Sequence, residues 1–129
     1  MSNKAVINTE TAPAAIGPYS QAVKAGNTVY LSGQIPLNPE TMEIVSDDFE
    51  AQARQVFTNL QAVCEEAAGS LGDIVKLNLY LVDLDNFAIV NKVMEEFFST
   101  PFPARAAVGV KALPKGSQVE AEAVMVIGD

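Results

Sequence analysis

The sequence predicts an α+β fold in which two helices cover one face of a mixed, six-stranded sheet. Six stretches with strand character and two amphipathic helical stretches follow one another in the order β-β-β-α-β-α-β-β. The chain has 129 residues, of which 49% are hydrophobic and 19% are charged, so it can bury a core without disulfides. We therefore expect a single domain that spans residues 1–129.

The first third of the chain has the pattern of three short strands. We predict strands at residues 5–7, 20–24 and 28–32, and the Ala-Gly-Asn tripeptide at 25–27 predicts a hairpin turn between the last two. The stretch between the first two strands is rich in Pro and Gly, which indicates an ordered loop. A second loop is expected at 36–43.

Residues 47–68 have the clearest helical pattern, because their apolar side chains recur at three- and four-residue steps. Asp47 is the expected N-cap, with Glu50 three residues later, and Gly69 suits the left-handed position after the helix. The predicted apolar stripe comprises Phe49, Ala53, Val56, Phe57, Leu60, Val63, Cys64 and Ala67.

The second half of the chain continues the alternation of strands and helices. A strand is predicted at 75–81, where apolar and polar side chains alternate, and a second helix at 85–98, which Pro101 stops. Strands at 104–110 and 119–126 complete the sheet. The apolar side chains expected on one face are Val75, Leu77, Leu79 and Leu81 of the strand and Phe87, Val90, Met94, Phe97 and Phe98 of the helix.

The two helices are expected to cover only one face of the sheet. The opposite face is predicted to carry Val108, Val110, Leu79 or their neighbours, which makes it too apolar to face water. A chain of this size would cover such a face with copies of itself, so we expect a homo-oligomer.

Charge and composition disfavour several classes of function. The formal net charge is -8, from 16 acidic and 8 basic residues, so nucleic-acid binding is not expected. The chain has no histidine and one cysteine, Cys64. This composition disfavours a zinc, copper or iron site and catalysis by Ser-His-Asp or Cys-His groups. Cys64 lies on the predicted apolar stripe and is interpreted as a buried hydrophobe, not a reactive thiol.

The N-terminal residues lack the apolar segment of a secretion signal, and no apolar run approaches the length of a membrane span. We therefore expect a cytoplasmic protein with no membrane contact.

Arg105 is the first candidate for binding chemistry. It stands at the start of a predicted strand among small apolar residues, with no acidic residue near it in sequence. Such an arginine either pairs with a distant carboxylate or serves as an anion receptor, for which its planar fork suits a carboxylate.

Glu120 and Glu122 share one face of the last predicted strand. They either belong to a solvated strand face or supply a general base that positions water. If their strand pairs with that of Arg105, the carboxylate and the guanidinium can approach one substrate together. Tyr19 in the Pro/Gly-rich loop and Ser32-Gly33 at a strand end are weaker candidates, with Gly33 allowing close backbone approach to a ligand.

The chain resembles the RidA/YjgF family over essentially its whole length. The resemblance rests on IGPYSQA at 16–22, LSGQIP at 31–36, the QAR of the first helix, and the C-terminal stretches PARAAVGVKALP and VEAEA. It implies a chorismate-mutase-like fold and homotrimers with three clefts between subunits. Deaminase members hydrolyse 2-aminoacrylate, its tautomer 2-iminopropanoate and related imino acids to 2-oxo acids and ammonia, with no cofactor.

The resemblance also implies roles for individual residues. Arg105 matches the arginine that binds the substrate carboxylate, and Glu120 matches the glutamate that holds or activates water. The matching pocket-lining positions are Tyr19, Ser32, Gly33 and Asn91. Some bacterial members carry a cysteine where this chain has Ala107, so backbone groups are expected to suffice for substrate binding there.

Two other functions remain open at this point. One is a non-catalytic trimeric binder of small carboxylates, which the presence of Arg105 disfavours. The other is a ribonuclease or translation inhibitor, which the negative charge and the lack of a basic patch disfavour.

Overall fold

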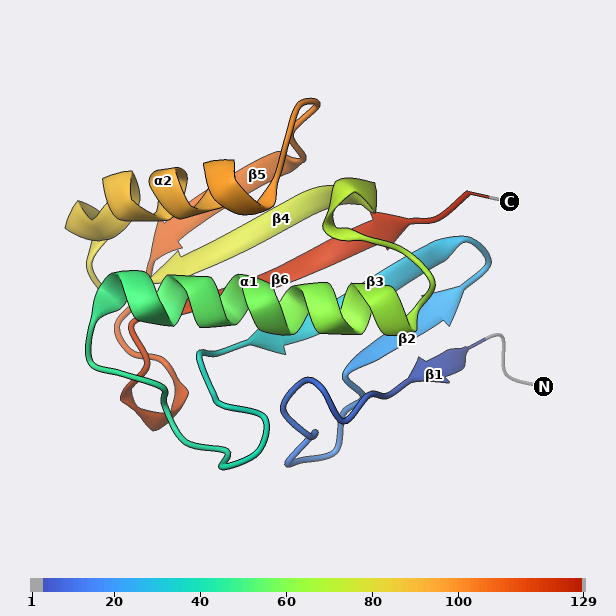
Figure 1. Ribbon diagram of the computed structural model, residues 1–129, viewed down its shortest axis with the longest axis horizontal. Helices are drawn as coiled ribbons and strands as arrows, with labels where there is room; N and C mark the ends of the chain where they lie inside the picture. Colours follow the sequence, from blue (N-terminus) through green and yellow to red (C-terminus); the bar gives the residue numbers. More distant parts are fainter. Residues whose placement is uncertain (1–3, 129) are drawn as a thin grey trace.

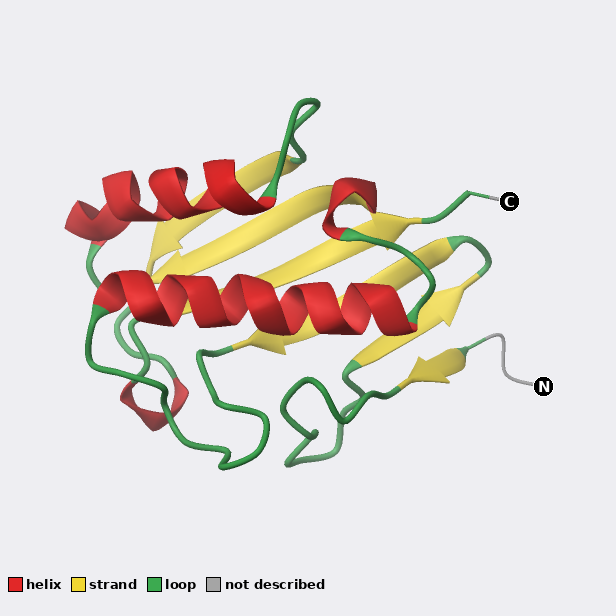
Figure 2. Cartoon of the chain, viewed as in Figure 1, coloured by secondary structure: helices red, strands yellow, loops and turns green. Residues whose placement is uncertain are grey.

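The computed structural model describes residues 4–128 and contains one six-stranded sheet with two helices (Figures 1 and 2). Residues 1–3 and 129, the ends of the predicted domain, lie outside this range. The strands are β1 (Ala5–Ile7), β2 (Ala22–Ala25), β3 (Thr28–Gln34), β4 (Ile74–Leu81), β5 (Ala104–Gly109) and β6 (Val119–Val126), and the helices are α1 (Phe49–Glu66) and α2 (Phe87–Phe97). The predicted fold class and order of elements are confirmed.

The strands lie in the order β1-β2-β3-β6-β4-β5, so the last strand of the chain sits between β3 and β4. Among the six described strands, β4 and β5 are the one parallel pair, and the other neighbours are antiparallel. Both helices lie on the same face of the sheet (Figure 1). Among residues 4–128, no helix combines the length and the apolar character that a membrane span needs.

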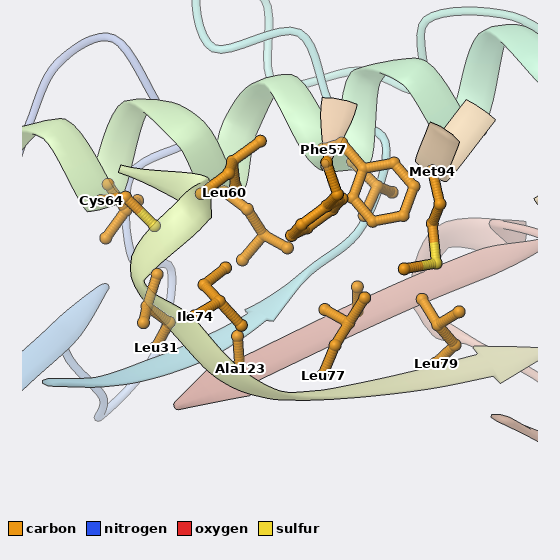
Figure 3. Close-up of a cluster of buried hydrophobic side chains, with 14 of the residues drawn as sticks. Leu31, Phe57, Leu60, Cys64, Ile74, Leu77, Leu79, Met94 and Ala123 are labelled. Atoms are coloured by element: carbon orange, nitrogen blue, oxygen red, sulfur yellow. The ribbon is translucent and has the colours of Figure 1, made fainter. Parts of the chain in front are cut away.

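The core lies between the helices and the covered face of the sheet. The whole predicted stripe of α1 is buried, and it meets inward side chains of the central strands (Figure 3). Phe57 contacts the rings of Phe97 and Phe98, both with centroids 5.6 Å away. Cys64 is fully buried, and burial raises the pKa of its thiol to about 12, as expected for a packing residue.

Both ends of α1 differ from the prediction. Asp48, not Asp47, is the N-cap, and its Oδ2 accepts a hydrogen bond from the Ala51 N–H at 2.9 Å. At the other end the left-handed residue is Ala68 (φ 66°), not Gly69. Gly69 is required for space, since a Cβ there would lie 2.7 Å from the sulfur of Met125.

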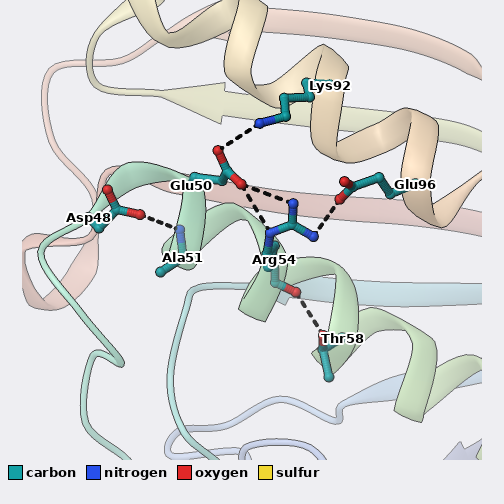
Figure 4. Close-up of polar contacts among 7 residues, drawn as sticks. All are labelled: Asp48, Glu50, Ala51, Arg54, Thr58, Lys92 and Glu96. Atoms are coloured by element: carbon teal, nitrogen blue, oxygen red, sulfur yellow. Dashed lines mark hydrogen bonds and ion pairs between the residues drawn. The ribbon is translucent and has the colours of Figure 1, made fainter.

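Glu50 therefore lies one position too early for a capping box and instead joins a charged network between the helices (Figure 4). Its carboxylate binds Arg54 at 2.9 Å and Lys92 at 3.3 Å, and Arg54 also pairs with Glu96 of α2. The second helix begins later than predicted, because a short 3₁₀ turn (Leu84–Asn86) precedes α2.

The alternation of β4 also differs from the prediction at its start. Ile74 is buried and Val75 is exposed, because the pairing with β6 shifts register between Ile74 and Lys76.

The open face of the sheet is less apolar than predicted. Leu79 is buried on the helix-covered side. The middle of the open face carries Asn78 and Tyr80 of β4 beside Glu122 and Glu120 of β6, with apolar side chains such as Val108 around them.

Candidate active site

A pocket of about 480 Å³ holds the two glutamates of β6. We call it the glutamate pocket. It is an open pocket bounded by the loop before β2, the end of β3 and its following loop, and the start of β6. Its lining includes Tyr19, Gln21, Ser32, Gly33, Glu120 and Glu122, together with the apolar side chains of Ile16, Ile35, Leu37 and Pro114.

The loop that carries Tyr19 is held by a buried glutamine. The Gln21 side chain is only 2% exposed. Its Nε2 donates to the carbonyl oxygens of Pro13 at 2.8 Å and Thr9 at 3.0 Å, and its Oε1 accepts from the Thr9 N–H at 2.7 Å. These bonds fix the loop so that Tyr19, half exposed, lines the pocket.

An irregularity in β3 shapes the pocket wall. The pairing with β6 shifts register between Leu31 and Gln34, and the Ser32 hydroxyl donates to the Ser20 carbonyl oxygen at 2.6 Å. A Cβ at Gly33 would lie 2.5 Å from Glu120 Oε2. The close approach that we predicted at this glycine therefore accommodates the Glu120 carboxylate.

The two glutamates of this pocket have different surroundings. Tyr80 donates a hydrogen bond from its hydroxyl to Glu122 Oε1, and this bond raises the pKa of Tyr80 to about 12. Glu120 has no hydrogen bond or ion pair from its side chain to any residue in 4–128. Burial raises the pKa of Glu120 above the ordinary carboxyl value, and the charge of Glu122 raises it further.

A second pocket, of about 310 Å³, holds Arg105. We call it the arginine pocket, and it is lined by Asn91, Met94, Glu95, Phe102, Pro103 and Arg105. Asn91 Oδ1 accepts a hydrogen bond from Arg105 Nη1 at 2.6 Å, and the guanidinium carbon lies 4.8 Å from the centre of the Phe87 ring. Arg105 forms no ion pair within the described part of the chain. Its remaining N–H groups can therefore bind an anion.

The two pockets lie on opposite faces of the sheet. Arg105 is in register with Leu77, which faces the helices, whereas Glu120 is in register with Tyr80 on the open face. The condition under which Arg105 and Glu120 of one chain could approach a substrate together, direct pairing of their strands, is not met, because β4 lies between β5 and β6. One chain therefore keeps the two charged groups apart.

The predicted candidates thus divide into two groups. Tyr19, Ser32 and Gly33 lie with Glu120, and Asn91 lies with Arg105. Ala107 follows Arg105 on the same side of β5, in register with Leu79. Sequence reasoning missed three residues that hold the candidates in place, namely Gln21, Tyr80 and Phe87. Each of them reads as an ordinary strand or helix residue until its partners are known.

Comparison with known proteins identifies the family. A family model described as endoribonuclease L-PSP matches residues 9–127. A crystal structure of RidA from an Antarctic Psychrobacter superposes with a TM-score of 0.93 at 57% identity, covering 95% of this chain and 99% of that one. The chain belongs to the RidA/YjgF family.

Relatives within the RidA/YjgF family carry the name of an activity. A protein of Dermatophagoides farinae named 2-iminobutanoate/2-iminopropanoate deaminase is 50% identical over 127 residues, which is 98% of this chain and 99% of that protein. A protein of Escherichia coli K12 with the same name is 50% identical over 123 residues, covering 93% of this chain and 95% of that protein.

Proposed function

We propose that this protein is a hydrolytic deaminase of reactive 2-imino and 2-enamino acids, of the 2-iminopropanoate and 2-aminoacrylate type. The reaction adds water to the C=N bond and releases a 2-oxo acid and ammonia. Relatives of about 50% identity that are named for this activity and match nearly the full chain support the proposal. So does an arginine pocket whose guanidinium has no carboxylate partner in the described chain.

The observation that carries the mechanism is the separation of the two pockets within one chain. A homotrimer with clefts between subunits, as the family resemblance implies, brings the arginine pocket of one subunit to the glutamate pocket of the next. The lining of the glutamate pocket contains no cation. The lining of the arginine pocket contains one carboxylate, that of the exposed Glu95, which forms no ion pair with Arg105. Arg105 and the half-buried Glu120, the pair proposed for the reaction, therefore lie in separate pockets. We infer that the complete site is shared between chains.

In this site Arg105 binds the substrate carboxylate through a bidentate, charge-assisted contact. Asn91 and the Phe87 ring hold the guanidinium in place. Tyr19, Ser32 and Gly33 line the opposite wall, and Ala107 contributes backbone groups beside the arginine. The bound carboxylate fixes the position of the imine carbon relative to water, which replaces a bimolecular encounter with an oriented one.

Glu120 takes a proton from the attacking water as the oxygen bonds to the carbon of the protonated imine, which gives a neutral carbinolamine. The Glu120 carboxyl group returns this proton to the amino nitrogen, the C–N bond breaks to release ammonia, and the proton of the hydroxyl group passes back to the Glu120 carboxylate as the carbonyl forms. A carboxyl group with a raised pKa suits this exchange, because its pKa lies closer to the pH at which the enzyme works.

The test is to generate an imino acid with an amino-acid oxidase and follow its loss with and without the protein. We expect faster loss with the parent and much slower loss with Arg105→Ala or Glu120→Gln. Binding of small carboxylates without any acceleration would instead favour the non-catalytic binder.

The description of the family model raises ribonuclease activity as a second candidate. Two glutamates in the larger pocket and a net charge of -8 oppose it. Salt-sensitive binding of RNA would favour it.

A further inference from the structure

The glutamate pocket contains two carboxylates, of Glu120 and Glu122, on the same face of one strand. Water activation needs one carboxylate that is free to exchange a proton, and two equivalent anions would share a proton between them. The structure makes the two groups unequal. This inference rests on the proposed function, because it concerns how the water-activating residue is selected.

Tyr80 creates the difference. Its backbone is in register with Glu120 across the β4–β6 pair, but its hydroxyl reaches the diagonal neighbour, Glu122. Glu122 is therefore held toward β4. The Glu120 side chain lies on the same face but leans toward β3, with its carboxylate against Gly33. The two carboxylates are drawn to opposite sides of their strand.

We propose that Tyr80 and Glu122 are positioning residues of the active site. Tyr80 holds the Glu122 side chain on the β4 side of the pocket, which leaves Glu120 as the carboxylate that exchanges protons with water. Burial, and secondly the nearby Glu122 carboxylate, raise the pKa of Glu120 above that of an isolated carboxyl group.

The charged and titratable groups around Glu120 agree with this assignment. Its own strand supplies Glu122 and β4 supplies Tyr80, whereas β3 supplies Gly33 and Ser32, which carry no charge. The loop before β2 supplies the side chain of Tyr19. Two cations lie near these elements without pairing with Glu120. Lys76 of β4 is in register with Val124, and Lys115 donates to the Met42 carbonyl oxygen at 3.0 Å.

Two variants test the proposal in opposite directions. In Glu122→Gln the neighbouring charge is lost, so the acid limb of the pH profile of kcat/KM should move to lower pH by about 0.5–1 unit. In Tyr80→Phe the ring remains but Glu122 loses its donor and can turn toward Glu120, so the acid limb should move to higher pH. Tyr30→Phe removes a hydroxyl from the same open face of the sheet and serves as the matched control, with no expected shift.

A second readout separates this proposal from the proposed function. The titration of the Glu120 side-chain carbon, followed by ¹³C NMR, should show the same two shifts of opposite sign whether or not the protein is a deaminase. Coincident titration curves for the parent, Glu122→Gln and Tyr80→Phe would overturn the positioning role. Shifted titration curves without imine hydrolysis would uphold the positioning role and refute the deaminase function.

Discussion

At the scale of single residues, the chain offers a natural comparison between its two arginines. The guanidinium of Arg54 is satisfied by Glu50 and Glu96, whereas that of Arg105 meets an amide oxygen, a methionine sulfur and an aromatic ring. A structural arginine loses its partners when it is truncated, while a receptor loses its ligand. The two should therefore respond differently to substitution.

We expect Arg105→Ala to weaken the binding of a 2-oxo acid about 10- to 100-fold, the loss of a charge-assisted bidentate contact. kcat/KM should fall by more than the affinity, because the imine carbon is no longer oriented toward water. Arg105→Lys should recover only part of the affinity and of kcat/KM, since an ammonium lacks the planar fork. Isothermal titration and the imine assay measure these effects.

Thermal melting provides the control for this prediction. Arg105→Ala should change the Tm little, whereas Arg54→Ala should lower it slightly and leave turnover intact. An Arg105→Ala variant that melted much earlier, yet hydrolysed imino acids at the parental rate while folded, would show that Arg105 is structural.

For Glu120, the substitution Glu120→Gln should lower kcat strongly and leave KM for the imino acid nearly unchanged, because Arg105 still holds the carboxylate. Glu66→Gln at the exposed end of α1 removes the same charge at a residue that lines neither pocket, and it should have no effect on kcat. Equal turnover of the two variants would return Glu120 to the role of a solvated surface residue.

The Glu120→Gln substitution should also affect stability, and the raised pKa of Glu120 gives the direction of the effect. Burial and Glu122 raise the pKa of Glu120 in the native state, so its ionised form costs stability as the pH rises above the ordinary carboxyl value. Removing this charge should leave the Tm at neutral pH unchanged or slightly higher. A clearly lower Tm would mean that the carboxylate has a stabilising partner.

At the scale of elements, two glycines make close contacts of different kinds. A methyl group at Gly33 meets the carboxylate end of the Glu120 side chain, whereas one at Gly69 meets Met125 and Ile127 in the core. Gly33→Ala should thus lower kcat by displacing Glu120, with little change in stability. Gly69→Ala should destabilise by about 1–3 kcal/mol through overpacking, with kcat kept. Denaturant unfolding and the imine assay distinguish these outcomes. The reverse pattern would contradict the placement of Glu120 against Gly33 in the active site.

The spacing of apolar side chains predicted the helices and strands well, because it depends only on which side chains of one element face the core. The stripe of α1 and the strand at 119–126 follow directly from it. It carries no information about which strands become neighbours, so the insertion of β6 between β3 and β4 could not be predicted. For the same reason Arg105 and Glu120 could be assigned to strands of the sheet, but it could not be predicted that their side chains point to opposite faces of it. Ile74 is buried in place of Val75 because the pairing of β4 with β6 shifts locally, and the alternation of apolar and polar residues does not predict such a shift.

At the scale of the whole molecule, the open face has a mixed character, with polar residues at its centre and exposed apolar residues such as Val108 beside them. We expect this protein to form a homotrimer that joins the two kinds of pocket. Sedimentation equilibrium should give three times the chain mass at micromolar concentrations. A monomer mass under these conditions would refute the shared site.

The shared site is tested most directly by complementation between two inactive variants. Arg105→Ala and Glu120→Gln chains, each with a different affinity tag, are co-expressed, and mixed trimers are purified through both tags. In every mixed trimer about one interface in three joins an intact Arg105 to an intact Glu120, so about a third of the parental activity should return. If mixed trimers are as inactive as the two parent variants, Arg105 and Glu120 do not act together across a subunit boundary.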